Sequence, residues 1–80
     1  MDTKPVLIIE DDANIVELLT IHLHDLGCKV LSSSDGWQGL NLAREEQFDL
    51  IILDIMLPGL NGMEICRKIR QTDRHTPILM

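Results

Sequence analysis

The sequence predicts an α/β protein with a parallel sheet flanked by helices, in the order β-α-β-α-β-α-β. Two short apolar runs, at residues 6–9 and 50–53, are rich in branched side chains, which is typical of strands buried on both faces. Segments with helical spacing of apolar residues lie between the strand-like runs. Such alternation predicts right-handed crossovers that place helices on both faces of one sheet. We expect a single domain over residues 1–80.

The first strand and the first helix have clear sequence signals. The run at residues 6–9 ends abruptly in acidic residues, and Asp12 is placed to cap a helix over residues 14–26. Gly27 follows as a C-terminal stop. The residues with helical spacing, which we expect to face inward, are Ile15, Val16, Leu19, Leu23 and Leu26.

The second strand and the second helix are separated by a polar turn. Residues 28–32 predict a short strand, and residues 33–36 predict the turn. Ser34 or Asp35 is placed to cap a helix that runs to about residue 46. The residues that we expect on the inward face of this helix are Trp37, Leu40 and Ala43.

The last third of the chain repeats the opening pattern. Residues 49–54 are an apolar run closed by an acid, and residues 57–62 form a loop by composition. A third helix is predicted from residue 63 to about residue 71, and a fourth strand over residues 78–80. The inward residues of the third helix are Ile65, Cys66 and Ile69.

Composition excludes several classes of protein. The chain is 45% hydrophobic and 25% charged, which is ordinary for a globular domain and unlike a disordered tail, a collagen or a disulfide scaffold. Its net charge of −6 opposes binding to nucleic-acid phosphates. We expect neither a membrane span nor a secretory leader, because no apolar run is long enough for either. Cys28 and Cys66 indicate buried thiols in a reducing cytoplasm, so we expect a cytoplasmic protein.

Acidic side chains follow two of the predicted apolar strands. Glu10 and Asp11 come after the first strand, and Asp54 comes after the third. A single acid at the start of a helix is more often a cap than a ligand, but two strands that both end in acids favour a site. If the two strands are neighbours in the sheet, the three carboxylates converge at its carboxyl edge, where ligands of open parallel sheets bind. Their mutual repulsion calls for a cation, and oxygen ligands suit Mg²⁺, with the backbone carbonyl of Met56 as a further candidate.

Two motifs of the chain resemble those of a known family, the receiver domain of bacterial two-component response regulators. The motif residues are Val6-Leu7-Ile8-Ile9-Glu10-Asp11-Asp12 and Leu50-Ile51-Ile52-Leu53-Asp54-Ile55-Met56-Leu57-Pro58-Gly59-Leu60-Asn61-Gly62. The resemblance extends to Thr76-Pro77-Ile78-Leu79-Met80 and includes the 43-residue step from Asp11 to Asp54. It implies a flavodoxin-like fold with the strand order 2-1-3-4-5.

The resemblance also implies a function and a set of site residues. Asp54 would be the phosphoacceptor, which takes a phosphoryl group from the phosphohistidine of a sensor histidine kinase. Asp11 would bind Mg²⁺ directly, Glu10 would help through water, and the carbonyl of Met56 would be the third protein ligand. The chain would then be a regulator that accepts phosphate, at most with self-phosphorylation and self-dephosphorylation, rather than an enzyme.

The chain also departs from the family pattern. Receivers have five strand–helix units, whereas this sequence stops in the fourth strand, so the flavodoxin-like sheet would be incomplete. The Ser or Thr after the fourth strand and the Lys after the fifth are absent. We therefore expect self-association through the open edge of the fourth strand or through the uncovered sheet face.

Residues 61–70 loosely resemble receivers that precede winged-helix DNA-binding domains. The resemblance implies control of transcription in a full-length protein, with contact to DNA only through an output domain that these 80 residues do not contain.

Two other functions stay open at the level of sequence. One is a fragment that binds Mg²⁺ or a protein partner without being phosphorylated. The other is a phosphatase of the haloacid-dehalogenase type, which also has a nucleophilic Asp after a parallel strand. That class has a second Asp two residues further on, and here the position is Met56, which argues against it.

Overall fold

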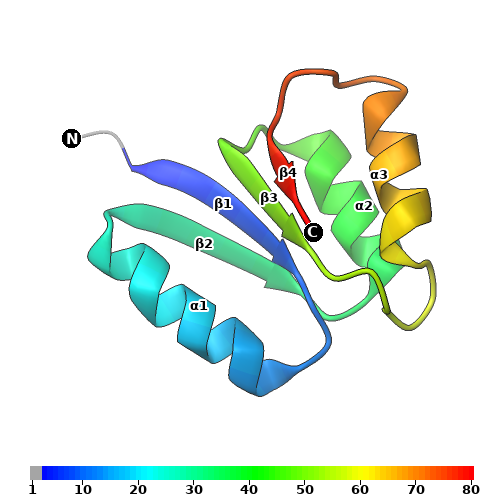
Figure 1. The fold of residues 1–80 in the computed structure, drawn as a ribbon. Helices are drawn as coiled ribbons and strands as arrows, with labels where there is room; N and C mark the ends of the chain where they lie inside the picture. Colours follow the sequence, from blue (N-terminus) through cyan, green and yellow to red (C-terminus); the bar gives the residue numbers. More distant parts are fainter. Residues whose placement is uncertain (1–2) are drawn as a thin grey trace.

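A computed structural model of the chain describes residues 3–80 and contains all seven predicted elements in the predicted order (Figure 1). Their bounds are β1 Lys4–Ile9, α1 Ala13–Asp25, β2 Cys28–Ser33, α2 Gly36–Glu45, β3 Leu50–Leu53, α3 Gly62–Arg70 and β4 Ile78–Leu79. The strands form one parallel sheet in the order β2-β1-β3-β4. The predicted α/β class and the predicted order of these strands are confirmed.

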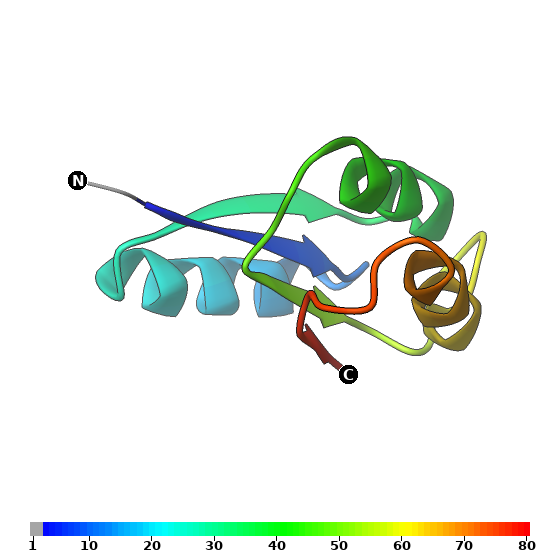
Figure 2. The ribbon, with the colours of Figure 1, turned by 90° about the horizontal axis from the view of Figure 1, so that it is seen from above.

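The central strand β1 is buried on both faces, as its continuous apolar run predicts. Alternate residues of a strand point to opposite faces, so Leu7 and Ile9 face one layer of helices while Val6 and Ile8 face the other. Figure 2 shows α1 on one side of the sheet, with α2 and α3 on the other. The main core lies on the side of α2 and α3, and consists of Leu7, Ile9, Leu40, Phe48, Ile51, Leu53, Ile65 and Ile69.

The side of the sheet that carries α1 is more open. No residue of α1 is buried, and the prediction that Ile15 and Leu26 face inward is wrong, since they are 42% and 77% exposed. Leu26 lies past the end of the helix. Ile15 borders a groove of about 650 Å³ between α1 and β4, whose other apolar lining residues include Leu19, Ile52 and Leu79.

The prediction of an inward face of α2 with Trp37, Leu40 and Ala43 is only partly confirmed, since Leu40 is buried and Ala43 is half-buried against the core. Gly36, Gly39 and Leu40 are the buried residues of α2, whereas Trp37 is 52% exposed, so the prediction of an inward Trp37 is wrong. Successive residues of a helix are turned by about 100°, and a stripe that passes through positions 36, 39 and 40 therefore leaves position 37 at its margin.

The helix caps follow from local side-chain chemistry. Asp12 accepts hydrogen bonds from the amides of Asn14 and Ile15, at 2.9 and 3.4 Å, and Asp35 accepts one from Gln38 at 3.2 Å. The predicted cap Asp12 is therefore confirmed, and of the two candidates Ser34 and Asp35 the cap of α2 is Asp35. Asn61 caps α3 in the same way, with its side-chain oxygen 3.0 Å from the amide of Glu64.

The two thiols are free and only half-buried, so the prediction of buried thiols overstates their burial. Cys28 begins β2 and Cys66 lies in α3. Within residues 3–80, none of the helices combines the length and the apolar character that crossing a bilayer requires.

Candidate functional site

The backbone of the sheet holds the candidate acids in place. The amide of Glu10 donates to the carbonyl of Ser33 at 3.0 Å, and the amide of Asp54 donates to the carbonyl of Ile9 at 2.9 Å. These hydrogen bonds continue the pairing of β1 with β2 and of β3 with β1 by one residue. The first residue after each of these strands is therefore fixed at the carboxyl edge of the sheet.

The three predicted acids lie together at this edge. Glu10, Asp11 and Asp54 each present a carboxylate oxygen, and these oxygens lie within 4.8 Å of one another. Asp11 is exposed, while Glu10 and Asp54 are half-buried. Carboxylate oxygens are hard ligands, and this spacing allows a small divalent cation to bind two of the groups directly and the third through water. The donor set thus fits the Mg²⁺ that the sequence predicts.

The electrostatics of the cluster are unfavourable without a counter-charge. Partial burial raises the pKa of the Glu10 carboxyl above its ordinary value of 4.5, and the neighbouring Asp54 and Asp11 act in the same direction. The backbone amide of Asp12, which donates to Glu10 at 3.2 Å, opposes this rise in pKa. A bound cation would favour the charged form of all three acids and relieve their repulsion.

The loop after Asp54 is attached to that side chain. The amide of Met56 donates to Oδ1 of Asp54 at 3.3 Å, and the side chain of Met56 is 81% exposed. At the end of the loop, the amide of Gly62 donates to the carbonyl of Ile55 at 2.8 Å. The backbone around Met56 is therefore tied to the candidate nucleophile on one side and to the start of α3 on the other.

Asp12 is the third acid in the opening motif but does not belong to the cluster. Its carboxylate caps α1 instead, through the amides of Asn14 and Ile15. The three consecutive acids after β1 thus divide into two that face Asp54 and one that begins a helix.

The sequence did not reveal that the first turn of α2 lies against the loop after Asp54. The amide of Gly36 donates to the carbonyl of Pro58 at 3.3 Å. Gly59 lies beside the side chains of Asp35 and Trp37 and has a φ of +85°. The available signal was the small residue directly after the cap Asp35, since glycine at that position permits a close approach of another backbone.

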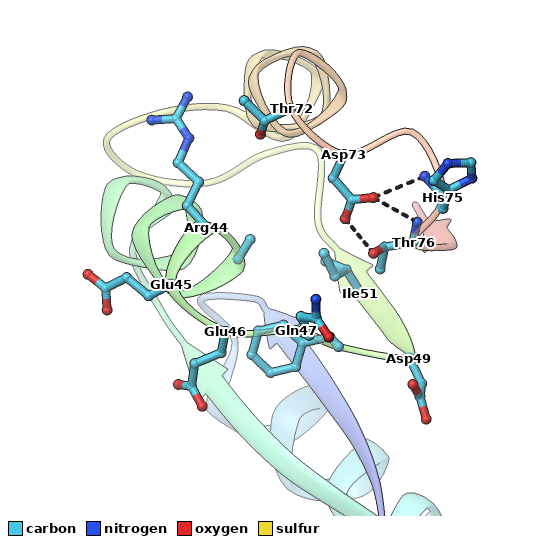
Figure 3. Close-up of a pocket in the computed structure, with 12 residues that line it drawn as sticks. Arg44, Glu45, Glu46, Gln47, Asp49, Ile51, Thr72, Asp73, His75 and Thr76 are labelled. Atoms are coloured by element: carbon cyan, nitrogen blue, oxygen red, sulfur yellow. Dashed lines mark hydrogen bonds between the residues drawn. The ribbon is translucent and has the colours of Figure 1, made fainter.

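A second cavity, of about 660 Å³, lies at the amino ends of β3 and β4 (Figure 3). Its side chains carry charges of both signs. Asp73 accepts hydrogen bonds from the Thr76 hydroxyl and from the amides of His75 and Thr76, and these bonds lower its pKa to about 2. The Asp73 carboxylate therefore stabilises the turn between α3 and β4, at the end of the sheet away from the acid cluster.

Comparison with known protein families and curated proteins gives one consistent result. Residues 6–80 match the response regulator receiver domain family. The chain is 44% identical over 77 residues to the alkaline phosphatase synthesis transcriptional regulatory protein PhoP of Bacillus subtilis. This alignment covers 96% of this chain and 32% of the relative. It is 47% identical over 75 residues to the transcriptional regulatory protein AfsQ1 of Streptomyces coelicolor, covering 94% of this chain and 33% of the relative. The chain spans about a third of the length of these relatives.

Solved structures give the same result for the fold. The chemotaxis response regulator CheY4 of Vibrio cholerae superposes with a TM-score of 0.93 and 32% identity, over 99% of this chain and 68% of that one. The receiver domain of the Pseudomonas aeruginosa sensor histidine kinase PA1611, solved with magnesium coordinated in its active-site cleft, has a TM-score of 0.90 and 30% identity, over 96% and 65%. The Thermotoga maritima response regulator TrrA, solved in complex with the histidine kinase ThkA, has a TM-score of 0.87 and 33% identity, over 95% and 66%.

Proposed function

This chain belongs to the response regulator receiver domain family of two-component systems, and on that premise we propose that Asp54 is its phosphoacceptor. The observation that carries the proposal is the acid cluster, in which an Asp54 oxygen lies within 4.8 Å of oxygens of Glu10 and Asp11. Asp54 is held at the carboxyl edge of the sheet, where ligands of open parallel sheets bind.

The chemistry of the proposed transfer is simple for a carboxylate. An oxygen of Asp54 attacks the phosphorus of a phosphohistidine, a P–O bond forms, and the P–N bond breaks. The imidazole nitrogen keeps the electron pair of the broken bond and takes up a proton. The Met56 amide holds Oδ1 of Asp54, which limits the rotation of the carboxylate and keeps it aimed out of the sheet edge.

We propose that Mg²⁺ is the cation of the acid cluster. Asp11 would bind it directly, Glu10 would contribute through water, and the backbone carbonyl of Met56 would be a further ligand. When bound, the ion neutralises the charge of the cluster and of the incoming phosphoryl group. The donor chemistry of the three acids supports this assignment, as does the magnesium in the related PA1611 receiver domain.

The proposed partner in phosphorylation is a sensor histidine kinase, as in the complex of the related TrrA with ThkA. The transcriptional regulators among the relatives support a role in the control of transcription for a longer protein that carries this domain. Contact with DNA would then be made by an output domain outside these 80 residues.

We also propose that the 80-residue chain associates with a second copy of itself. Backbone groups on one edge of β4 face outward, because its only partner within residues 3–80 is β3. Beside that edge lie exposed apolar side chains, with Leu79 59% and Met80 52% exposed. Light scattering at micromolar concentration should give a dimer or larger species, and Leu79→Lys should shift it toward monomer. A monomeric mass for the unchanged chain contradicts the proposal.

Phosphorylation of the chain can be tested directly by mass. The protein is incubated with acetyl phosphate and Mg²⁺, and its intact mass is measured beside that of Asp54→Asn. The expected result is one added phosphoryl group on the wild type and none on the variant. If neither gains mass, the 80-residue chain is not a phosphoacceptor, and binding of Mg²⁺ or a partner without phosphorylation becomes the better assignment.

A further inference from the structure

We propose that Gly36, at the start of α2, is a positioning residue for the loop between Asp54 and α3. The inference rests on the proposed function, in which the backbone carbonyl of Met56 in this loop is a ligand of Mg²⁺. Gly36 lies 18 positions before Asp54 in the sequence and is absent from the acid cluster. Gly36 has no side chain that could bind a metal, so its effect on the site would be indirect.

The loop after Asp54 is held at two points, one at the start of α3 and the other at the start of α2. The amide of Gly62 in α3 donates to the carbonyl of Ile55 at 2.8 Å, and the amide of Gly36 in α2 donates to the carbonyl of Pro58 at 3.3 Å. Met56 lies between these two attachments. The path of the Met56 backbone is therefore set by the first turns of both helices, which Figure 1 shows next to the loop.

Gly36 allows the loop to approach because it has no side chain. A Cβ built at this position would overlap the carbonyl oxygen of Leu60 and would lie 2.9 Å from its carbonyl carbon and 3.0 Å from its nitrogen. All three atoms belong to the backbone, so no flexible side chain can turn aside to make room. Any larger residue at position 36 must displace the loop or the start of α2.

The two residues beside Gly36 close around the same loop. A Cβ added at Gly59 would lie 2.5 Å from Oδ1 of Asp35 and 3.3 Å from Cδ1 of Trp37. Asp35, Gly36 and Trp37 thus form a cradle for residues 58–60, which we call the α2 cradle.

Gly39 in the same helix offers a matched control. A Cβ at Gly39 would lie 2.7 Å from Cδ1 of Ile9, which is a buried side chain of β1 rather than a part of the loop. Both Gly36→Ala and Gly39→Ala add one methyl group to α2 and create a steric conflict. Only Gly36→Ala directs that conflict at the loop after Asp54.

Two measurements on the intact chain test the proposal. The first compares the backbone amide chemical shifts of Leu57, Gly59, Leu60 and Asn61 without metal, where Gly36→Ala should move these resonances and Gly39→Ala should leave them near wild type. The second is a calorimetric Mg²⁺ titration at a temperature where all variants are folded. Gly36→Ala should bind Mg²⁺ about tenfold more weakly than the wild type. Gly39→Ala is the control for the loop resonances only, because its conflict falls on Ile9, whose carbonyl accepts from the amide of Asp54.

The outcomes separate this inference from the proposed function. If the wild type binds Mg²⁺ and Asp54→Asn does not, but Gly36→Ala binds as the wild type does, the positioning role is wrong. If the wild type itself fails to bind Mg²⁺, the proposed function fails. The positioning role is then tested by the metal-free loop resonances, and unchanged resonances in Gly36→Ala overturn it. Should Gly36→Ala not fold, Trp37→Ala replaces it, because it removes the half-exposed wall of the α2 cradle without adding atoms. Unmoved loop resonances and unchanged Mg²⁺ affinity in Trp37→Ala overturn the inference as well.

Discussion

Replacing Asp54 with Asn is expected to stabilise the metal-free chain and to reduce the stabilisation that Mg²⁺ provides. The substitution keeps the shape of the side chain and an oxygen that can accept the Met56 amide, and it removes one negative charge from the acid cluster. Two repulsive pairs disappear, those of Asp54 with Glu10 and with Asp11. The same charge attracts a cation, so its loss has opposite effects without and with Mg²⁺.

The size of the effect follows from the separation of the carboxylates. At 4.8 Å, the largest separation of the cluster oxygens, two unit charges repel by about 0.9 kcal/mol in a medium with the dielectric constant of water. Screening at an ionic strength of about 0.1 M, where the Debye length is about 10 Å, reduces this to about 0.5 kcal/mol. Two pairs together give about 1 kcal/mol, which corresponds to a rise in melting temperature of about 4–8 °C for a domain of this size.

Thermal unfolding followed by circular dichroism, in EDTA and in excess Mg²⁺, measures both effects. Asp12→Asn is the matched control, because it changes the net charge equally but removes a cap carboxylate outside the cluster, and Asn caps as well as Asp. Asp54→Asn should melt above the wild type in EDTA and gain less from Mg²⁺, while Asp12→Asn should follow the wild type. Equal melting temperatures of the two variants in EDTA would refute the repulsion argument, and an equal gain in Mg²⁺ would refute the assignment of Asp54 to the cation site.

Three further predictions concern stability. The pKa of Asp73 is lowered from 3.8 to about 2, so the contribution of this carboxylate to stability is complete above about pH 4 and is lost as the pH falls toward 2. The urea midpoint of the wild type should drop over that pH range, and that of Thr76→Val should drop less. Equal drops in the two proteins would contradict the role of the Thr76 hydroxyl. Asn61→Ala removes the cap of α3 and should lower the free energy of unfolding by about 1 kcal/mol, as measured by urea denaturation. An unchanged free energy of unfolding would contradict a stabilising role of this cap. Ile65→Ala, at a position with 0% exposure, should cost about 3 kcal/mol in the same assay, and a cost below about 1 kcal/mol would mean that the core collapses around the gap.

Local patterns in the sequence predict the elements of the fold and place the candidate acids directly after two of its strands. Residues 6–9 and 50–53 are continuous apolar runs, which form β1 and β3, and these become neighbours in the sheet. Once two parallel strands are adjacent, the residues that follow them meet at one edge. Glu10, Asp11 and Asp54 could be assigned to one site because the resemblance to receiver domains implies a strand order in which the first and third strands are neighbours.

The errors of the sequence prediction concern which side of a helix is covered. Spacing indicates that a helix is amphipathic but does not fix which of two adjacent stripes has a partner, as Trp37 shows in α2. Ile15 has the right spacing but borders an open groove. The contact of Gly36 with Leu60 depends on how a loop returns over a helix more than 20 residues earlier, and no local pattern contains that information.

The absence of buried residues in α1 has a consequence for how fast its backbone amides exchange hydrogen with solvent. Leu7, Ile8 and Ile9 of β1 are fully buried and lie in a strand paired on both edges, so their amides should exchange hydrogen with solvent only through global unfolding. The amides of α1 should exchange much faster, through fraying of a helix that little apolar contact holds. The amide of Asp54 donates to the carbonyl of the buried Ile9, and the amide of Glu10 donates to the carbonyl of Ser33 in β2, whereas Asp11 lies next to the residues that begin α1. The chain thus joins two acids anchored to the sheet by their backbone amides to a third acid at the start of a helix that has no buried residue.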